Sequence, residues 1–179
     1  MSFFALRGHY WAFVAILCLV FFPREFNSLK FLGGALLWLW AAWLRVQVRL
    51  SIGEHSRLNV LTVPELLTEG WFAWSRNPLY LSNLLMVSGC LLLGGWSYWI
   101  IIVMMVLSIL FYYKVVDEEE KYLEKEFGLA FANYKLKAPK WFSFALPKVD
   151  FKWSWPVVRK DFWTWFWQAI FFVALWVVP

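Results

Sequence analysis

The stretch that most constrains the fold runs from Pro78 to Val116, because Lys114 is the one charged residue in it. It is about twice as long as the ~20 mostly apolar residues that a helix needs to cross a bilayer. The pair Gly94-Gly95 interrupts it near its middle, and paired glycines favour turns. The sequence therefore predicts two antiparallel helices, 78–94 and 97–116, joined as a tight hairpin.

Composition extends this argument to the whole chain. Of 179 residues, 62% are hydrophobic, against about 45–50% in an ordinary soluble domain. A chain this short cannot hide such an excess in one core, because much of its surface must stay exposed. The sequence predicts an integral membrane protein, with residues 1–179 forming a single membrane domain.

Three further apolar stretches, 3–22, 32–50 and 161–178, match the length of a membrane span. The first lacks a small-residue cleavage site and is read as a retained helix rather than a signal peptide. Arg45 and Arg49, near the end of the second, are expected to snorkel into the headgroup region. The prediction is an all-α, polytopic protein with about five transmembrane helices.

Basic residues predict the orientation of these spans. If the N-terminus is cytoplasmic, the opposite side receives only Arg24 and Lys30, and the other 15 of the 17 Lys and Arg residues face the cytoplasm. Cytoplasmic loops carry the excess of positive charge. The N-terminus and the segments 51–77 and 117–160 are therefore predicted to be cytoplasmic, with the C-terminus on the opposite side.

The net charge of +5 needs no nucleic acid to explain it. Lysines between 135 and 160 alternate with tryptophan and phenylalanine, which next to a span is typical of a segment that binds anionic lipids. Two cysteines and two histidines, without ligand spacing, predict no metal site.

The helix that begins at residue 97 is expected to continue past the bilayer surface to Gly128, a typical helix-ending glycine. Its polar part carries an apolar stripe at helical spacing, formed by Val115, Val116, Leu123 and Phe127. Glu119 and Glu120 border this stripe, where a carboxylate needs a partner because burial removes it from water. Asp117 falls mainly on the outer side, where it can pair with Lys121 four residues later.

A tight hairpin brings the start of its first helix beside the end of its second. Arg76, Asn77, Pro78 and Tyr80 are therefore expected at the same cytoplasmic end as Glu119 and Glu120. An arginine with two carboxylates can form a structural ion pair or a pocket for a zwitterion, and the residues alone leave both open.

Two separated motifs carry a family resemblance. "LLTEGWFAWSRNPLYLSNLLMVSGCLLL" and, after a second span, "EEEKYLEKEFGLAFANYKLKAPKWF" resemble the isoprenylcysteine carboxyl methyltransferase and phospholipid methyltransferase superfamily over about Leu66 to Phe142. The matching residues are Thr68, Gly70, Arg76, Asn77, Pro78, Tyr80, Glu119, Glu120, Leu123, Phe127, Gly128, Tyr134 and Pro139. The chain departs from the pattern at four positions, with Asn77 for histidine, Ser82 for glycine, Phe131 for tyrosine and Lys140 for arginine.

The resemblance implies an S-adenosylmethionine-dependent methyltransferase whose donor binds at the cytoplasmic end of the hairpin. The implied cofactor-binding residues are Arg76, Asn77, Pro78, Tyr80, Glu119, Glu120 and Tyr134, with Arg76 and Glu120 as catalytic candidates. The chemistry of these residues suits the donor. The two glutamates can bind its ammonium or its ribose, and Arg76 can bind its carboxylate. The tyrosine rings can pack against its adenine or its sulfonium.

The preferred acceptor is the carboxylate of an isoprenylcysteine-like lipid, entering laterally from the bilayer. A phospholipid amine and a thiol are the alternatives within the same class. A nicotinamide-dependent membrane reductase shares an Arg-x-Pro-x-Tyr hairpin, and a non-enzymatic membrane scaffold is the alternative from another class. The substitution at Asn77 leaves the acceptor open.

Overall fold

The computed structural model describes residues 10, 14, 24–53, 65–145, 147–148 and 153–177, and its regular structure there is entirely helical. The elements are α3 (Ser28–Ile52), α4 (Trp71–Trp74), α5 (Pro78–Leu93), α6 (Tyr98–Phe127), α7 (Leu129–Lys137), α8 (Trp155–Val158), η2 (Arg159–Asp161) and α9 (Phe162–Val177). The predicted span 3–22 lies outside the described residues, except for Tyr10 and Val14.

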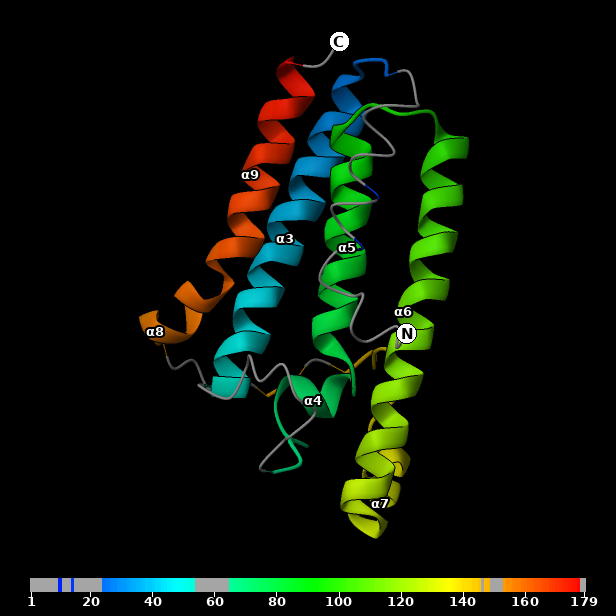
Figure 1. The fold of residues 1–179 in the computed structure, drawn as a ribbon, viewed down its shortest axis with the longest axis vertical. Helices are drawn as coiled ribbons and strands as arrows, with labels where there is room; N and C mark the ends of the chain where they lie inside the picture. The colour runs from blue at the N-terminus through cyan, green and yellow to red at the C-terminus, as the bar shows by residue number, and fades with distance from the viewer. Residues whose placement is uncertain are drawn as a thin grey trace.

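The predicted all-helical class is confirmed within the described chain. The long helices α3, α5, α6 and α9 run alongside one another, and α7 lies at the far end of α6 (Figure 1). α3 and α6 are long and apolar enough to cross a membrane, whereas α5 and the Thr164–Leu175 part of α9 are shorter apolar helices. These helices support membrane association.

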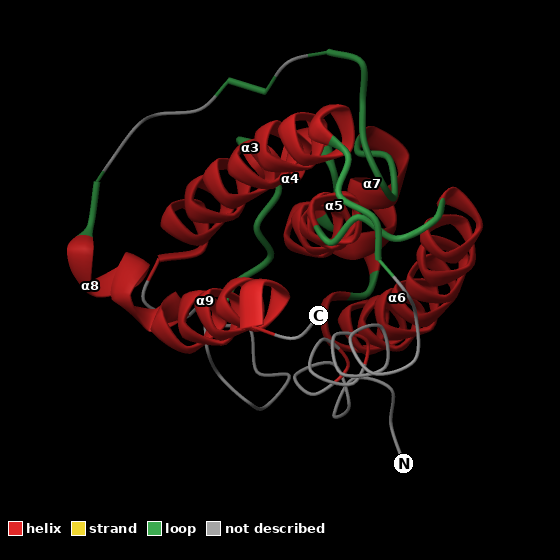
Figure 2. Ribbon diagram, turned by 90° about the horizontal axis from the view of Figure 1, so that it is seen from above, coloured by secondary structure: helices red, strands yellow, loops and turns green. Residues whose placement is uncertain are grey.

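Helices α5 and α6 are joined by residues 94–97, a connection that both views show (Figures 1 and 2), and they pack against each other. Gly95 has a φ of 74°, and a Cβ there would lie 2.5 Å from the carbonyl oxygen of Glu25. The predicted break is therefore confirmed, because this turn needs a residue without a side chain. The predicted helix end at Gly128 is also confirmed, with a φ of 50° immediately after α6.

A close helix contact joins α3 to α5 through two glycines. A Cβ built on Gly89 would lie 2.8 Å from the Cβ and 2.9 Å from the backbone nitrogen of Trp38, and one on Gly34 would lie 2.8 Å from the nitrogen of Leu93. Small residues at such positions let helix backbones approach closely, as they do in membrane helix pairs.

We expect Gly89→Ala to destabilise the protein by about 1–3 kcal/mol, because the added methyl group overlaps backbone atoms that cannot rotate away. Gly33→Ala is the matched control on α3, because nothing lies within 4 Å of its Cβ position. Thermal unfolding of both variants in detergent measures the difference. Equal midpoints would contradict the close contact.

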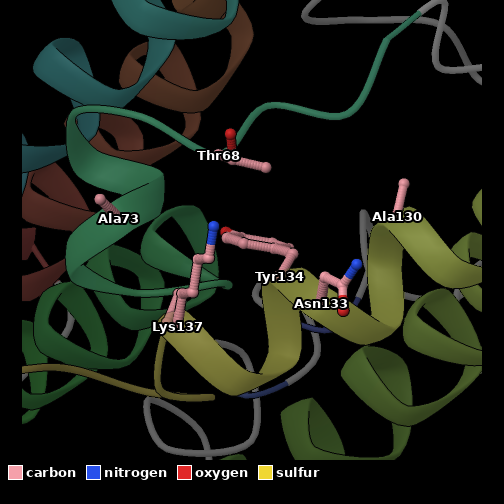
Figure 3. A pocket seen from close by; sticks show the side chains of 7 residues that line it. Thr68, Ala73, Ala130, Asn133, Tyr134 and Lys137 are labelled. Atoms are coloured by element: carbon pink, nitrogen blue, oxygen red, sulfur yellow. The ribbon is translucent and has the colours of Figure 1, made fainter.

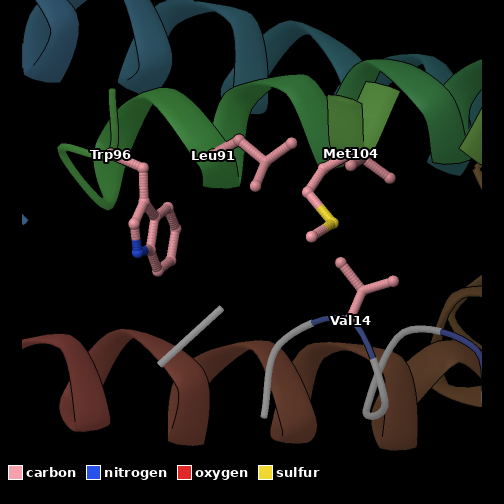
Figure 4. Close-up of a cluster of buried hydrophobic side chains, with 5 residues drawn as sticks. Val14, Leu91, Trp96 and Met104 are labelled. Atoms are coloured by element: carbon pink, nitrogen blue, oxygen red, sulfur yellow. The ribbon is translucent and has the colours of Figure 1, made fainter. Parts of the chain in front are cut away.

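Buried apolar side chains tie the helices together at the end that contains the 94–97 turn. Val14, Val87, Leu91, Trp96 and Met104 form one buried cluster, in which Met104 points toward Val14 (Figure 4). Large apolar residues on the outer surfaces of α3, α6 and α9 are in contrast exposed. Extensive exposed apolar surface marks contact with lipid or protein.

One expectation about α3 is wrong. Arg45 and Arg49 do not extend to the surface; they are 5% and 8% exposed and both contact Asp161 of η2. The reason is tertiary: η2, distant in sequence, places a carboxylate beside both guanidinium groups.

Candidate functional site

The start of α5, the polar half of α6, α7 and the segment after α7 meet at one end of the molecule (Figure 1). Gly128 gives the sharp turn that lets α7 fold back beside α6. The predicted apolar stripe holds these elements together. Val115 and Val116 are buried against Tyr80, while Leu123 and Phe127 pack on a second cluster formed by Phe131, Tyr134 and Ala138.

The structure brings Arg76 and Glu120 together as the sequence predicted. Arg76 Nε donates to Glu120 Oε1 at 3.0 Å, and Nη2 donates to Oε2 at 3.3 Å. The side chains are 11% and 14% exposed, so little water competes for this bidentate pair. Paired N–H donors in this arrangement are among the stronger hydrogen bonds in proteins.

Arg76 also fixes the end of α7. Its Nη1 donates to the carbonyl oxygens of Ala138 at 2.8 Å and Lys135 at 3.3 Å, and its backbone N–H donates to Pro139 at 2.9 Å. The last carbonyl groups of a helix have no partner within the helix, and Arg76 supplies one. The arginine therefore couples α7 to Glu120.

Asn77 is the residue before α5, but its side chain does not cap that helix. Ser75 Oγ instead accepts the backbone N–H of Asn77 at 3.0 Å. The side-chain Nδ2 of Asn77 donates to Glu120 Oε1 and to the carbonyl of Lys140, both at 3.1 Å. Pro78 occupies the first turn of α5, where a missing N–H carries no cost.

The two tyrosines predicted for the site both use their hydroxyl groups within the protein. Tyr80 donates to Glu119 Oε2 at 2.6 Å. Tyr134 donates to the carbonyl of Phe72 at 2.7 Å, and burial raises its pKa, so the phenol stays protonated at neutral pH. The structure thus places Glu119 with Tyr80, and Glu120 with Arg76 and Asn77, in two adjacent hydrogen-bonded groups.

Lys140 is a site residue that the sequence reasoning missed. Its Nζ lies 3.1 Å from Asp117 Oδ1, 4.0 Å from Glu120 Oε2 and 4.2 Å from the ring centroid of Tyr113. The hydrogen bond from Lys140 lowers the pKa of Asp117, which lies just beyond the predicted span. The sequence carried a signal for this residue, because Lys140 stands where the resembled family has an arginine.

Asp117 was expected to be a solvated residue paired with Lys121. That pair exists at 3.7 Å, but Asp117 also holds Lys140 against the site. Its role is therefore larger than the sequence indicated.

A pocket of about 340 Å³ adjoins this cluster, at the lower end of the ~300–1,000 Å³ of small-molecule sites. Tyr134 projects from α7 toward its middle (Figure 3). The residues that line it are Thr68, Ala73, Ala130, Asn133, Tyr134, Lys137 and Ala138. Because Ala138 also accepts a hydrogen bond from Arg76, the pocket and the ion pair share a wall.

The described residues include no group of three or more histidine, cysteine, aspartate or glutamate side chains that could hold a metal ion. The site instead combines carboxylates, an arginine, a lysine, an amide and aromatic rings beside a pocket. Such a set suits a ligand that carries an ammonium, hydroxyl groups and an aromatic base.

The fold and the site together define the class of this protein. It is an all-helical, membrane-associated protein with a polar site at the end of its apolar helices. The family model described as phospholipid methyltransferase matches residues 29–130, which cover α3 from its second residue, α4, α5, α6 and the first two residues of α7. The chain belongs to the phospholipid methyltransferase family, and methyltransferase activity follows from that membership. Comparison with curated proteins and with solved structures gives no match.

Proposed function

We propose that this protein is a multi-pass membrane methyltransferase that moves a methyl group from S-adenosylmethionine to a lipophilic acceptor. The observation that carries the proposal is the convergence of Arg76 and Asn77, just before α5, and Tyr80 of α5 with Glu119 and Glu120 of α6. The pocket beside Tyr134 and the family membership support it.

In this proposal the chain crosses the bilayer about five times, with the N-terminus and the site on the cytoplasmic side and the C-terminus opposite. The distribution of lysine and arginine supports this orientation. The exposed apolar surfaces of α3, α6 and α9 would then face lipid.

S-adenosylmethionine supplies an activated methyl group when bound. Glu120 and Glu119 would accept hydrogen bonds from its ammonium and ribose, and Tyr134 would contact its adenine from the pocket wall. The donor groups of Arg76 are mostly used by Glu120 and by the carbonyls of α7. In this proposal Arg76 acts mainly by orienting Glu120 rather than by binding the carboxylate of the donor.

The residues have little acid–base work to do, because methyl transfer depends mainly on alignment and exclusion of water. A carboxylate or thiolate acceptor reacts without a base. An ammonium acceptor must first lose a proton, and in this proposal Glu119 or Glu120 would accept it.

Two acceptors are favoured by different observations. The motif resemblance favours an isoprenylcysteine-like carboxylate, and the family match favours a phospholipid amine. A thiol is a third acceptor of the same reaction class. A tritiated methyl donor, supplied with each lipid class in vesicles, identifies the acceptor by the product that carries the label.

Calorimetric titration of the purified protein with S-adenosylmethionine and with NADPH tests the class. We expect saturable binding of S-adenosylmethionine in the range of about 1 µM to 1 mM that is usual for enzyme substrates, and no binding of NADPH. Binding of NADPH alone would indicate a reductase. Binding of neither would leave a scaffold as the surviving interpretation.

A further inference from the structure

A second buried polar cluster lies between α3, α5 and the start of α9. Arg45 Nη2 is 3.2 Å from Asp161 Oδ1, and Arg49 Nε is 3.1 Å from Asp161 Oδ2. The side chains of Arg45 and Asp161 are 7% and 2% exposed. Nothing in the proposed methyl transfer uses this cluster, and it shares no residue with the site around Arg76.

Arg45 is incompletely satisfied in this cluster. It shares its carboxylate partner with Arg49, and its remaining contacts are to uncharged groups, Asn83 Oδ1 and Thr164 Oγ1. Its Nε is buried without a hydrogen-bond partner within the described part of the chain. A buried donor without an acceptor carries a desolvation penalty of about 1–3 kcal/mol, more when the group is charged, and a second anion would remove it.

Two more unpartnered polar atoms lie along the same seam of helices. The indole nitrogen of Trp38, two turns before Arg45 on α3, and the side-chain oxygen of Gln168 on α9 are buried without a partner among the residues described. Trp38 packs edge-on against Trp165 and Phe172 of α9, with centroids 6.0 and 5.3 Å away. The contact between α3 and α9 therefore has the positively charged Arg45 at one end. Beyond Arg45 it has aromatic rings and isolated polar atoms.

We propose that Arg45 is the centre of a binding site for the phosphate of a membrane lipid held between α3, α5 and α9. A guanidinium group matches phosphate in shape and charge better than any other side chain. The aromatic continuation toward Trp38 favours a phosphate that carries an apolar body over free phosphate. Asp161 neutralises part of the positive charge, so the site fits a singly charged phosphodiester.

If the protein is the methyltransferase proposed above, the site at Arg45 is also placed to hold the lipid that accepts the methyl group. Asn83, which contacts Arg45, follows Asn77 by six residues, or about 9 Å along the axis of α5. A lipid with its phosphate at Arg45 would lie beside the helix whose first turn follows Asn77, and Arg45 would then position that lipid as the acceptor.

The test uses the full chain in detergent, without any methyl donor, and measures the midpoint of thermal unfolding. The probes are dioleoyl phosphatidylglycerol, which carries a phosphodiester, dioleoyl glycerol, which has the same chains without it, and inorganic phosphate. We expect phosphatidylglycerol to raise the midpoint by about 5 °C and the other two to leave it unchanged. Equal stabilisation by both lipids, or by inorganic phosphate, would overturn the proposal.

Arg45→Gln should abolish the increment due to phosphatidylglycerol. Arg159→Gln, two residues before Asp161 on the exposed surface of η2, should retain it and is the matched control. An increment unchanged in Arg45→Gln would also overturn the site.

If Arg45→Gln does not fold, Asp161→Asn provides a second test of the site. It removes the competing carboxylate, so the midpoint without lipid should fall and the increment from phosphatidylglycerol should exceed that of the wild type. A purely structural ion pair gives the fall without any larger response to lipid. Because no donor is present, failure here leaves the methyltransferase proposal standing, and failure of donor binding leaves this site standing.

Discussion

Replacement of Glu120 by glutamine should weaken S-adenosylmethionine binding by about ten- to a hundredfold, with a proportional loss of methyl transfer. Glu120 accepts from Arg76 through both oxygens and from Asn77 through Oε1. Glutamine replaces one acceptor by a donor, which then faces another donor. Hydrogen bonds to charged groups contribute about 1.5–3 kcal/mol each, and each 1.4 kcal/mol is about tenfold in affinity.

Electrostatics acts in the same direction. Without the carboxylate, Arg76 and Lys140 leave excess positive charge where the positively charged ammonium and sulfonium of the donor would bind. Calorimetric titration gives the change in affinity. Glu124→Gln is the control on the same helix, because Glu124 is 54% exposed and pairs with Lys135 outside the site. Equal affinity in wild type and Glu120→Gln would remove Glu120 from the site while leaving the family assignment intact.

Replacement of Asp161 by alanine should cost about 3–5 kcal/mol of stability, because it leaves buried guanidinium groups without their shared carboxylate. Arg45 and Arg49 both reach Asp161, which is 1% exposed. We expect the unfolding midpoint in detergent to fall by about 10 °C, since 1 kcal/mol shifts it by ~2–4 °C in a chain of this size.

An exposed ion pair of similar length provides the comparison. Lys135 Nζ lies 3.0 Å from Glu124 Oε1, but the two side chains are 33% and 54% exposed. Glu124→Ala should cost about 1 kcal/mol or less. Similar losses in both variants would mean that burial does not strengthen the Asp161 cluster.

Much of the helical frame was accessible from the sequence because each element carries a local signal. The Gly94-Gly95 break, the start of α5 at Pro78 and the end of α6 at Gly128 are confirmed, and each rests on the backbone limits of proline or glycine. The Arg76–Glu120 contact was also predictable, because a short connection between antiparallel helices forces their far ends together.

The sequence could not indicate which side chains of the site would form their hydrogen bonds within the protein rather than with a ligand. Arg76 was expected to meet a ligand carboxylate, yet the fold gives it the carbonyls of α7. Tyr134 was expected to offer its ring, and its hydroxyl is committed to Phe72. These partners depend on how α7 folds back after Gly128, which no local pattern encodes.

The sequence by itself indicated the long apolar helices and brought Arg76 to the same end of the hairpin as Glu119 and Glu120, because periodicity and turn residues act over short distances along the chain. Only the tertiary structure decided that Arg45 and Arg49 are buried against Asp161, more than a hundred residues away in sequence. It also brought Lys140 to Asp117. Sequence periodicity does not indicate the distant partner of a charged side chain. That partner depends on how α9 and α7 pack against the rest of the chain.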